Sequence, residues 1–341
     1  MRRIKKSIAL LLSSVLILGL TACSKNDKEA TTEKPKQEVA SSHDTNSHYP
    51  VTITTYNYKK EPVEVTFEKA PENVIAVYQN SIETMLALGL EDKIKLASGL
   101  DHAVKDEYKE AFEKINYSEQ FTPDKETVIM EQPDLILSWW SIFDDKRLGE
   151  VDYWHENNAN TYMSLNSGAV ESKTIENETT DILNLGKIFN VEDKAEAIVN
   201  EINNNIDNVK KKVEGQEKQT ALIMEYMDGK IYTYGADTLG GDMVTKLGGE
   251  VSNPKGGNIS EEDLINLNPD SIFVVYMDRT DEKVAKEEVN KVLNNPALKS
   301  LKTVKDNRVN SIALGEMYCS GVRTIDGLNT FIDGLYPNLD K

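Results

Sequence analysis

The chain has 341 residues, of which 39 are Lys or Arg and 57 are Asp or Glu, so its formal net charge is −18. This acidic balance argues against nucleic acid as a partner, because phosphate binding needs a clustered basic surface. Two cysteines exclude a disulfide-rich scaffold and a cysteine-rich zinc module, while 39% hydrophobic residues suffice for ordinary folded cores.

The first 22 residues differ in charge from the rest, since they hold four basic residues and no acidic one. Without them the chain has 35 basic and 57 acidic residues, a net charge of −22. An apolar run over residues 8–20 follows the basic start and is too short for a comfortable membrane span, as in a secretory signal peptide. Leu20-Thr21-Ala22-Cys23 then resembles the bacterial lipobox. That resemblance implies cleavage after residue 22 and lipid, including palmitate, on Cys23.

Residues 24–48 form a polar segment without aromatic residues, in which Val39 is the single large aliphatic side chain. Such a composition cannot bury enough surface to fold. We therefore expect residues 23–48 to be the lipidated cysteine and a flexible tether that keeps a folded body close to a membrane.

Apolar segments alternate with helical segments in the next part of the chain, which starts near Tyr49. Strands are predicted over residues 74–77, 94–97, 135–137 and 162–165, and helices over residues 81–88 and 125–131. This alternation is typical of parallel sheets covered by helices. We expect residues 49–173 to form an N-terminal α/β lobe.

Residues 174–214 are rich in helix formers and are interrupted by Asn190-Val191-Glu192-Asp193. We predict one helix over residues 174–189 and a second that runs to about residue 213. The alternation then resumes, with strands predicted over residues 220–224, 271–276 and 309–313 and helices over residues 241–247 and 261–267. Residues 215–341 are expected to form a C-terminal α/β lobe, held by the helical connector.

The two halves share a local pattern. Glu126 is followed seven residues later by Pro133-Asp134 and an apolar run, and Glu262 is followed seven residues later by Pro269-Asp270 and another apolar run. Glu262 lies 136 positions after Glu126, and Pro269 lies 136 positions after Pro133. In each case a short helix ends, the residue before proline leaves the α region, and a strand begins. The repetition indicates an internal structural repeat.

These features together resemble the cluster A-III (helical-backbone) substrate-binding lipoproteins of ABC importers, which serve the uptake of iron–siderophore complexes, haem and cobalamin. The resemblance covers about residues 49–341. It implies an α/β fold of two Rossmann-like lobes with mainly parallel sheets, joined by a long connecting helix, with the ligand cleft between the lobes. It also implies a lipid-anchored binding protein, not an enzyme, on the extracytoplasmic face of the bacterial cell membrane. We expect a monomer without an intrinsic cofactor that delivers an iron chelate to a permease dimer.

Permease docking follows from the same resemblance. In that family, one glutamate on the top of each lobe docks onto arginines of the permease dimer, and it precedes the proline of the Pro-Asp element by seven residues. The matching positions are Glu126 and Glu262, with Glu261 as the alternative to Glu262 if the register differs by one. Carboxylate–guanidinium pairs are directional, so two of them would fix orientation as well as position.

Ligands of α/β lobes sit at the carboxyl ends of strands, which directs attention to the polar and aromatic residues there. The candidates of the N-terminal lobe are Tyr78, His102, Trp139 and Trp140, and those of the C-terminal lobe are Tyr226, Tyr276, Tyr318 and Arg323. Because neighbouring residues of a strand point to opposite faces, only some of them can line the cleft.

This set is mainly aromatic, and Arg323 is its best candidate charge. Catecholate siderophore complexes carry strong negative charge and would favour several Lys or Arg residues. Hydroxamate complexes, cobalamin and haem suit aromatic walls with one or two polar anchors, so we favour a hydroxamate-type Fe(III)–siderophore complex. Cobalamin stays open, because corrin-binding relatives also place a tryptophan after the strand that precedes Trp139. Haem would need an axial ligand, for which His102, Met227 and Tyr318 are candidates that stand in no specific motif.

Two other classes of protein compete with this interpretation. A binding protein for a bare metal ion would need about four converging ligands, but only His102 and His155 remain after the tether, and the carboxylates show no spacing motif. A secreted hydrolase lacks support, because the chain has no G-x-S-x-G or H-E-x-x-H motif. A glycosidase with a carboxylate pair stays open. The repeat and the helical connector favour a binding protein.

Overall fold

The computed structural model describes residues 48–278 and 283–339. The predicted signal peptide, the predicted lipidation site Cys23 and the part of the predicted tether up to residue 47 lie outside the described residues. Within the described ranges, no helix combines the length and the apolar character needed to cross a membrane.

The N-terminal sheet has five parallel strands in the order β5-β4-β3-β6-β7. Their bounds are β3 Val74–Val77, β4 Ile94–Ser98, β5 Tyr117–Ser118, β6 Leu135–Ser138 and β7 Asn160–Met163. Val74 and Ala76 pack in one buried cluster and Ile75 and Val77 in another, so the sheet is buried on both faces. Burial on both faces explains why the sequences of these strands are nearly continuous apolar runs.

Helices and one hairpin complete the N-terminal lobe. The antiparallel strands β1 Val51–Tyr56 and β2 Pro62–Phe67 form the hairpin, and the amide of Met163 in β7 donates to Thr55 Oγ1 of β1 at 3.1 Å. The α-helices are α1 Gln79–Ala87, α2 Lys109–Phe112, α3 Lys125–Met130 and α4 Val151–Glu156. Short 3-10 helices are η1 Glu91–Lys93, η2 Asp106–Tyr108, η3 Trp140–Phe143 and η4 Leu165–Ser167.

The C-terminal sheet is mixed, with the order β11-β9-β8-β12-β13 and β10 beside the start of β8. Strands β8, β10, β12 and β13 are parallel, whereas β9 runs antiparallel to β8 and β11 antiparallel to β9. The bounds are β8 Thr220–Met227, β9 Lys230–Tyr234, β10 Glu250–Val251, β11 Gly257–Ile259, β12 Ser271–Tyr276 and β13 Val309–Ala313. The helices are α7 Leu239–Lys246, α8 Glu261–Leu267, α9 Val284–Leu293, η5 Pro296–Ser300, α10 Lys302–Lys305, α11 Leu314–Met317, η6 Gly321–Arg323 and α12 Thr324–Leu335.

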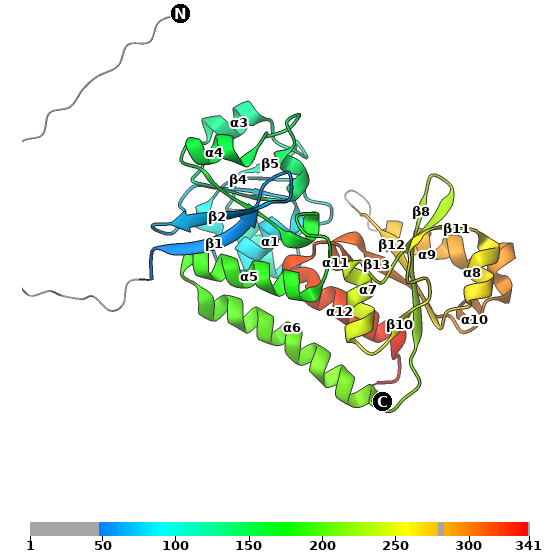
Figure 1. Cartoon of the computed structure of the whole chain (residues 1–341). Helices are drawn as coiled ribbons and strands as arrows, with labels where there is room; N and C mark the ends of the chain where they lie inside the picture. Colours follow the sequence, from blue (N-terminus) through cyan, green and yellow to red (C-terminus); the bar gives the residue numbers. More distant parts are fainter. Residues whose placement is uncertain (1–47, 279–282, 340–341) are drawn as a thin grey trace, which may run out of the picture. The chain divides into compact units, whose positions relative to one another are not determined.

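Two helices connect the sheets, α5 Ile175–Phe189 and α6 Glu192–Val213 (Figure 1). Thr174 caps the start of α5 by accepting from the amide of Asn177, and Asn190 ends it in a left-handed conformation. Both predicted connector helices are therefore present, with the break where the sequence indicated it. One buried cluster contains residues of both sheets and of both connector helices, so the lobes share a continuous core.

The repeated Pro-Asp pattern has the same structural use in each lobe. The carboxylate of Asp134 accepts from the amides of Glu72 and Asn73 at 2.8 and 2.9 Å, just before β3. The carboxylate of Asp270 accepts from the amide and the hydroxyl of Thr220, both at 2.9 Å, at the start of β8. Each aspartate thus fixes the start of the neighbouring parallel strand.

The predicted strands are present, and those over residues 74–77, 271–276 and 309–313 have the predicted bounds. One prediction is shifted: the strand expected over residues 162–165 is β7, Asn160–Met163. Its first two residues, Asn160 and Thr161, pair with Leu135 and Ile136 of β6. Both are polar, although Thr161 is buried, so a search for apolar runs places the start of the strand too late. Mixed α/β lobes with a parallel N-terminal sheet are as predicted.

Candidate ligand-binding site

Three aromatic side chains from both lobes meet at the boundary between them. Tyr78 follows β3 and Trp139 follows β6, and because these parallel strands are neighbours, the two rings have centroids 4.5 Å apart. Tyr318 follows α11 of the C-terminal lobe, and its ring centroid lies 5.6 Å from that of Trp139. We call Tyr78, Trp139 and Tyr318 the interlobe aromatic cluster. It brings together three of the residues predicted as ligand contacts.

The ring of Trp139 is held in place by a chain of hydrogen bonds. Its indole Nε1 donates to Oδ1 of Asn80 at 2.6 Å, and Nδ2 of Asn80 donates to the hydroxyl of Ser164 at 2.8 Å. Tyr78 has a backbone φ of 75°, which is unfavourable for a residue other than glycine. Such conformations persist where the surrounding structure enforces them, and they concentrate at functional sites.

An exposed cation that sequence reasoning missed lies beside this cluster. Nη1 of Arg147 donates to the hydroxyl of Tyr78 at 2.8 Å, while its side chain remains exposed. Arg147 stands in the loop of residues 144–150, which follows η3 and lies close after the strand that ends before Trp139. This loop position was the available signal, since a cation near a strand end can reach a ligand there.

A cavity of about 560 Å³ lies on the N-terminal lobe near the cluster. Its lining includes Leu100, Val104 and Phe121, and the ring of Phe121 has its centroid 5.7 Å from that of Tyr78. The cavity is therefore adjacent to the aromatic cluster, and its volume is in the range of small-molecule sites.

The C-terminal lobe adds further phenols on its side of the boundary. The hydroxyl of Tyr234 donates to the carboxylate of Glu225 at 2.6 Å, and its ring stands edge-on to that of Tyr232 at 5.3 Å. Burial raises the pKa of Tyr318, with smaller contributions from Cys319 and Tyr232. Burial also raises the pKa of Tyr234, and the bond to Glu225 adds to the shift. These phenols therefore keep their protons at neutral pH and can donate hydrogen bonds.

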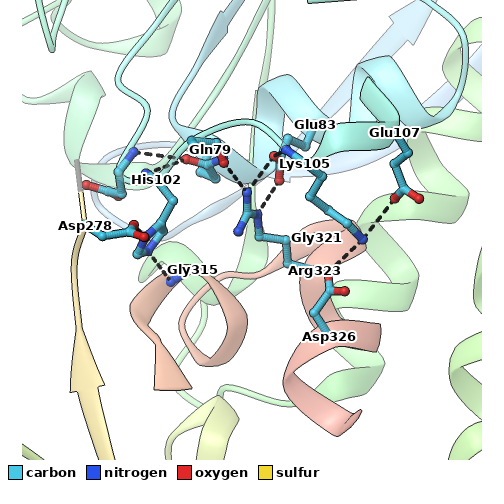
Figure 2. Close-up of polar contacts among 12 residues, drawn as sticks. Gln79, Glu83, His102, Lys105, Glu107, Asp278, Gly315, Gly321, Arg323 and Asp326 are labelled. Carbon is cyan, nitrogen blue, oxygen red and sulfur yellow. Dashed lines mark hydrogen bonds and ion pairs between the residues drawn. The ribbon is translucent and has the colours of Figure 1, made fainter. Parts of the chain in front are cut away.

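Arg323 has another partner in this structure than a ligand. Figure 2 shows its guanidinium pointing from η6 toward Glu83 on α1, with Nε and Nη2 donating to the carboxylate at 2.5 and 2.8 Å. Nη2 also donates to the carbonyl oxygen of Ala103 at 2.7 Å. Glu83 is fully buried and Arg323 is 8% exposed. The guanidinium thus joins the two lobes, and its charge is paired with Glu83 instead of being left for a ligand.

His102 also uses its polar atoms between the lobes. Its Nδ1 contacts the carboxylate of Asp278, and its Nε2 accepts from the amide of Gly315 at 3.2 Å (Figure 2). Tyr276 lies beside this histidine, with ring centroids 6.0 Å apart, and burial raises the pKa of Tyr276 to about 12. His102 and Tyr276 therefore take part in the contact between the lobes, and His102 also lines the cavity beside Phe121.

The remaining two aromatic candidates point elsewhere. The indole of Trp140 donates to the carbonyl oxygen of Tyr58 at 2.7 Å and stacks on the ring of Tyr58, so it supports the hairpin loop that follows β1. Tyr226 packs with the buried cluster near α8 and α9, with Nζ of Lys291 5.9 Å from its ring centroid. Among the described residues, no ring contact joins Trp140 or Tyr226 to the interlobe aromatic cluster.

The two candidate docking glutamates occupy equivalent positions. Glu126 is the second residue of α3 and Glu262 the second residue of α8, and both side chains are exposed. The helices begin at the same register of the repeat, after the N-caps Asp124 and Ser260. Glu261 accepts instead from Asn295 Nδ2 at 2.6 Å. The register supports Glu262 over Glu261 as the counterpart of Glu126.

The chain is similar to known proteins in three comparisons: with protein-family models, with solved structures and with curated sequences. The family model described as periplasmic binding protein matches residues 74–313. A crystal structure of a periplasmic binding protein from Veillonella parvula is 33% identical, with a TM-score of 0.80 over 85% of this chain and 92% of that one.

Two proteins of Bacillus subtilis are also similar over most of their length. The uncharacterized ABC transporter substrate-binding lipoprotein YvrC is 24% identical over 98% of this chain and 97% of its own. The petrobactin-binding protein YclQ is 26% identical over 80% of this chain and 84% of its own.

Proposed function

The chain belongs to the periplasmic binding protein family, and from this premise we propose that it is the substrate-binding lipoprotein of an ABC importer for iron–siderophore complexes. The relatives support this proposal, since one is a substrate-binding lipoprotein of an ABC transporter and another binds petrobactin. In this proposal Cys23 carries the lipid anchor, and the folded body captures its ligand on the extracytoplasmic face of the membrane. The protein binds and hands over its ligand without chemical conversion.

The interlobe aromatic cluster is the observation that carries the proposal. Tyr78 and Trp139 come from one lobe and Tyr318 from the other, so a ligand held there contacts both. Arg147 places an exposed guanidinium at the hydroxyl of Tyr78. Aromatic walls with one cationic anchor suit a bulky complex of low net charge. We therefore favour a hydroxamate-type Fe(III) complex over a catecholate complex.

Titration of tryptophan fluorescence in the mature protein tests this function. The panel contains a ferric hydroxamate, a ferric catecholate, haem and cobalamin. We expect the ferric hydroxamate to bind best and to quench the emission, because Trp139 lies in the cluster. Trp139→Phe should remove most of the quenching and weaken binding about tenfold, through loss of the Asn80 hydrogen bond and of ring contact.

Trp140→Phe is the matched control, because its ring stacks on Tyr58 and its loss should leave the affinity unchanged. Best binding of cobalamin or haem would assign the site to those ligands instead. If no member of the panel binds more tightly than about 10 μM, the transport proposal fails, because a weaker binder would capture little of a scarce ligand.

Docking is the second part of the proposal. We propose that Glu126 and Glu262 pair with arginines of the permease dimer, one from each lobe. Their exposure and their equivalent positions on α3 and α8 support this role. Rim charge pairs of this kind contribute more to orientation and association rate than to affinity.

A further inference from the structure

Exposed apolar side chains are concentrated next to one of the two docking glutamates. Six large hydrophobic side chains are exposed in the described part of the chain, and three of them lie on α3 and α4. These three are Ile129, Met130 and Tyr153, with exposed fractions of 43%, 75% and 36%. Single exposed apolar residues are ordinary on protein surfaces, whereas a group of them marks a contact site.

The apolar residues and the glutamate share one face of α3. Ile129 and Met130 stand three and four positions after Glu126, and residues with this spacing are neighbours on a helix surface. A groove of about 460 Å³ continues from this face between α3 and α4, lined by Ile129, Pro133, Tyr153 and Trp154 among others. A partner that pairs with Glu126 therefore meets an apolar surface directly beside the carboxylate.

The C-terminal lobe offers a different surface at the equivalent place. The residues that stand three and four positions after Glu262 are Ile265 and Asn266. Ile265 is half-buried and packs against the core of its own lobe, and Asn266 is an exposed polar residue. The repeat thus keeps the glutamate in both lobes but places an exposed methionine on one and an asparagine on the other.

We propose that the face of Glu126, Ile129 and Met130 is an apolar docking contact for the permease, which receives an apolar side chain of the permease next to the arginine that pairs with Glu126. This inference rests on the proposed function. The N-terminal lobe then contributes binding energy by burial as well as by charge, while the C-terminal lobe docks through Glu262 without such a contact. The two lobes are consequently not interchangeable on the permease.

Uptake by cells tests the contact. Cells that lack their own copy of the gene receive the full chain, either unchanged or with Met130→Asn, which copies the residue of the other lobe. The readout is the initial rate of uptake of a radiolabelled ferric tris-hydroxamate at limiting expression. Loss of a buried methionine side chain should lower the rate about tenfold. Asn266→Ala is the matched control at the equivalent position and should leave the rate unchanged.

Three further measurements identify the cause of a reduced rate. The purified Met130→Asn protein should bind the same chelate with unchanged affinity, because residue 130 lies outside the aromatic cluster. Its midpoint of thermal unfolding should also be unchanged, because Met130 is 75% exposed. Glu126→Ala combined with Glu262→Ala should abolish uptake with chelate affinity unchanged.

The remaining outcomes contradict the inference in distinguishable ways. If the double glutamate variant loses uptake while Met130→Asn retains it, docking stands and the apolar contact is wrong. If the unchanged protein neither binds nor imports this chelate, the hydroxamate assignment fails, and the uptake comparison uses the panel member that binds best. If no member of the panel binds, the proposed function fails and the contact fails with it. If sedimentation shows a dimer of the unchanged protein that Met130→Asn dissolves, the surface serves self-association, and the permease is not its partner.

Discussion

The side chains of Glu83 and Arg323 form a charged contact between the lobes that water hardly reaches. The guanidinium bonds to both carboxylate oxygens and to the carbonyl of Ala103. Removing two charges from water is costly, and only such complete pairing compensates for it. Loss of one partner is worse than the absence of both, because it leaves an uncompensated buried charge.

Glu83→Gln should therefore destabilise the protein strongly. The substitution leaves the Arg323 guanidinium buried without its counter-charge, and we expect the free energy of unfolding to fall by about 3 kcal/mol. Urea unfolding followed by circular dichroism measures this change. Lys302→Gln, which breaks an exposed pair with Asp270, is the control and should change stability little. Equal effects of the two substitutions would show that the buried pair contributes no more than a surface pair.

The residue scale also shows where sequence reasoning is limited. Arg323 stands in a loop after a strand, which predicts a ligand contact, but its partner is 240 positions away in the chain. Nothing local in the sequence indicates that pairing. The place of Trp139 at the carboxyl edge of the sheet was predictable, because the strand before it is an unambiguous apolar run. Its orientation depends on Asn80 and Ser164, which only the folded chain reveals.

Among the elements, α5 carries two buried carboxylates that connect it to both lobes. Glu178 accepts from the amides of Ser320 and Gly321 at 3.0 and 2.6 Å, at the start of η6 in the C-terminal lobe. Asp181 accepts from the hydroxyl of Tyr162 at 2.8 Å and from the amide of Leu165 at 2.9 Å, at the end of β7. Burial raises the pKa of both carboxyls, and the charge of Glu178 raises that of Asp181 further.

These raised pKa values make a prediction about stability and pH. Because the native state holds the proton of Asp181 more tightly than the unfolded state, its contribution to stability falls as pH rises from about 4 through the native pKa. The Asp181→Asn variant has no carboxyl at this position, so it lacks this fall in stability with rising pH. The free energy of unfolding of the variant, minus that of the unchanged protein, should therefore increase with pH over that window, as measured by urea unfolding at several pH values.

Glu176 on the same helix provides a control of opposite sign. Partial burial opposes ionisation of its carboxyl, but the bond and charge of Lys246, together with hydrogen bonds from its own backbone amide and from Thr174, outweigh this effect and lower its pKa. Its contribution to stability is therefore present above the unfolded pKa and is lost as pH falls. For Glu176→Gln, the free energy of unfolding of the variant minus that of the unchanged protein should decrease as pH rises. A parallel trend for both variants would contradict the assignment of the Asp181 shift to burial.

Helices and strands with a strong hydrophobic pattern were predicted from the sequence, whereas the strands of the hairpins were not. Strand β12 is a continuous apolar run and has the predicted bounds. Strand β9 was missed, although Asp228-Gly229 between β8 and β9 is a typical two-residue hairpin turn, and both residues have positive φ. Strand β11 has three residues, Gly257–Ile259, too few for a periodic signal. It forms because its antiparallel pairing with β9 satisfies backbone hydrogen bonds at the edge of the sheet.

At the scale of the whole molecule, several independent contacts oppose relative motion of the lobes. Helix α6 bonds to the N-terminal lobe through Lys194 Nζ and the carbonyl of Leu88 at 2.7 Å, and to α12 through Asn205 and Asn329 at 3.0 Å. The Glu83–Arg323 pair and the contacts of His102 add direct links between lobes. Large hinge closure needs a few loop residues that absorb the rotation, and here two helices and a shared core connect the lobes.

Ligand binding should therefore change the size of the protein very little. We expect small-angle X-ray scattering of the mature protein to give the same radius of gyration, within error, with and without a saturating amount of the chelate that binds best in the fluorescence titration. Glu83→Gln combined with His102→Ala weakens the direct links between the lobes, while the Lys105–Asp326 ion pair and the connector helices remain. That variant should show a larger radius without ligand, because lobes with fewer direct links sample more open arrangements, and the chelate should bring it back to the value of the unchanged protein. A marked contraction of the unchanged protein on binding would contradict this, and would mean that the interlobe contacts form only after the ligand has entered.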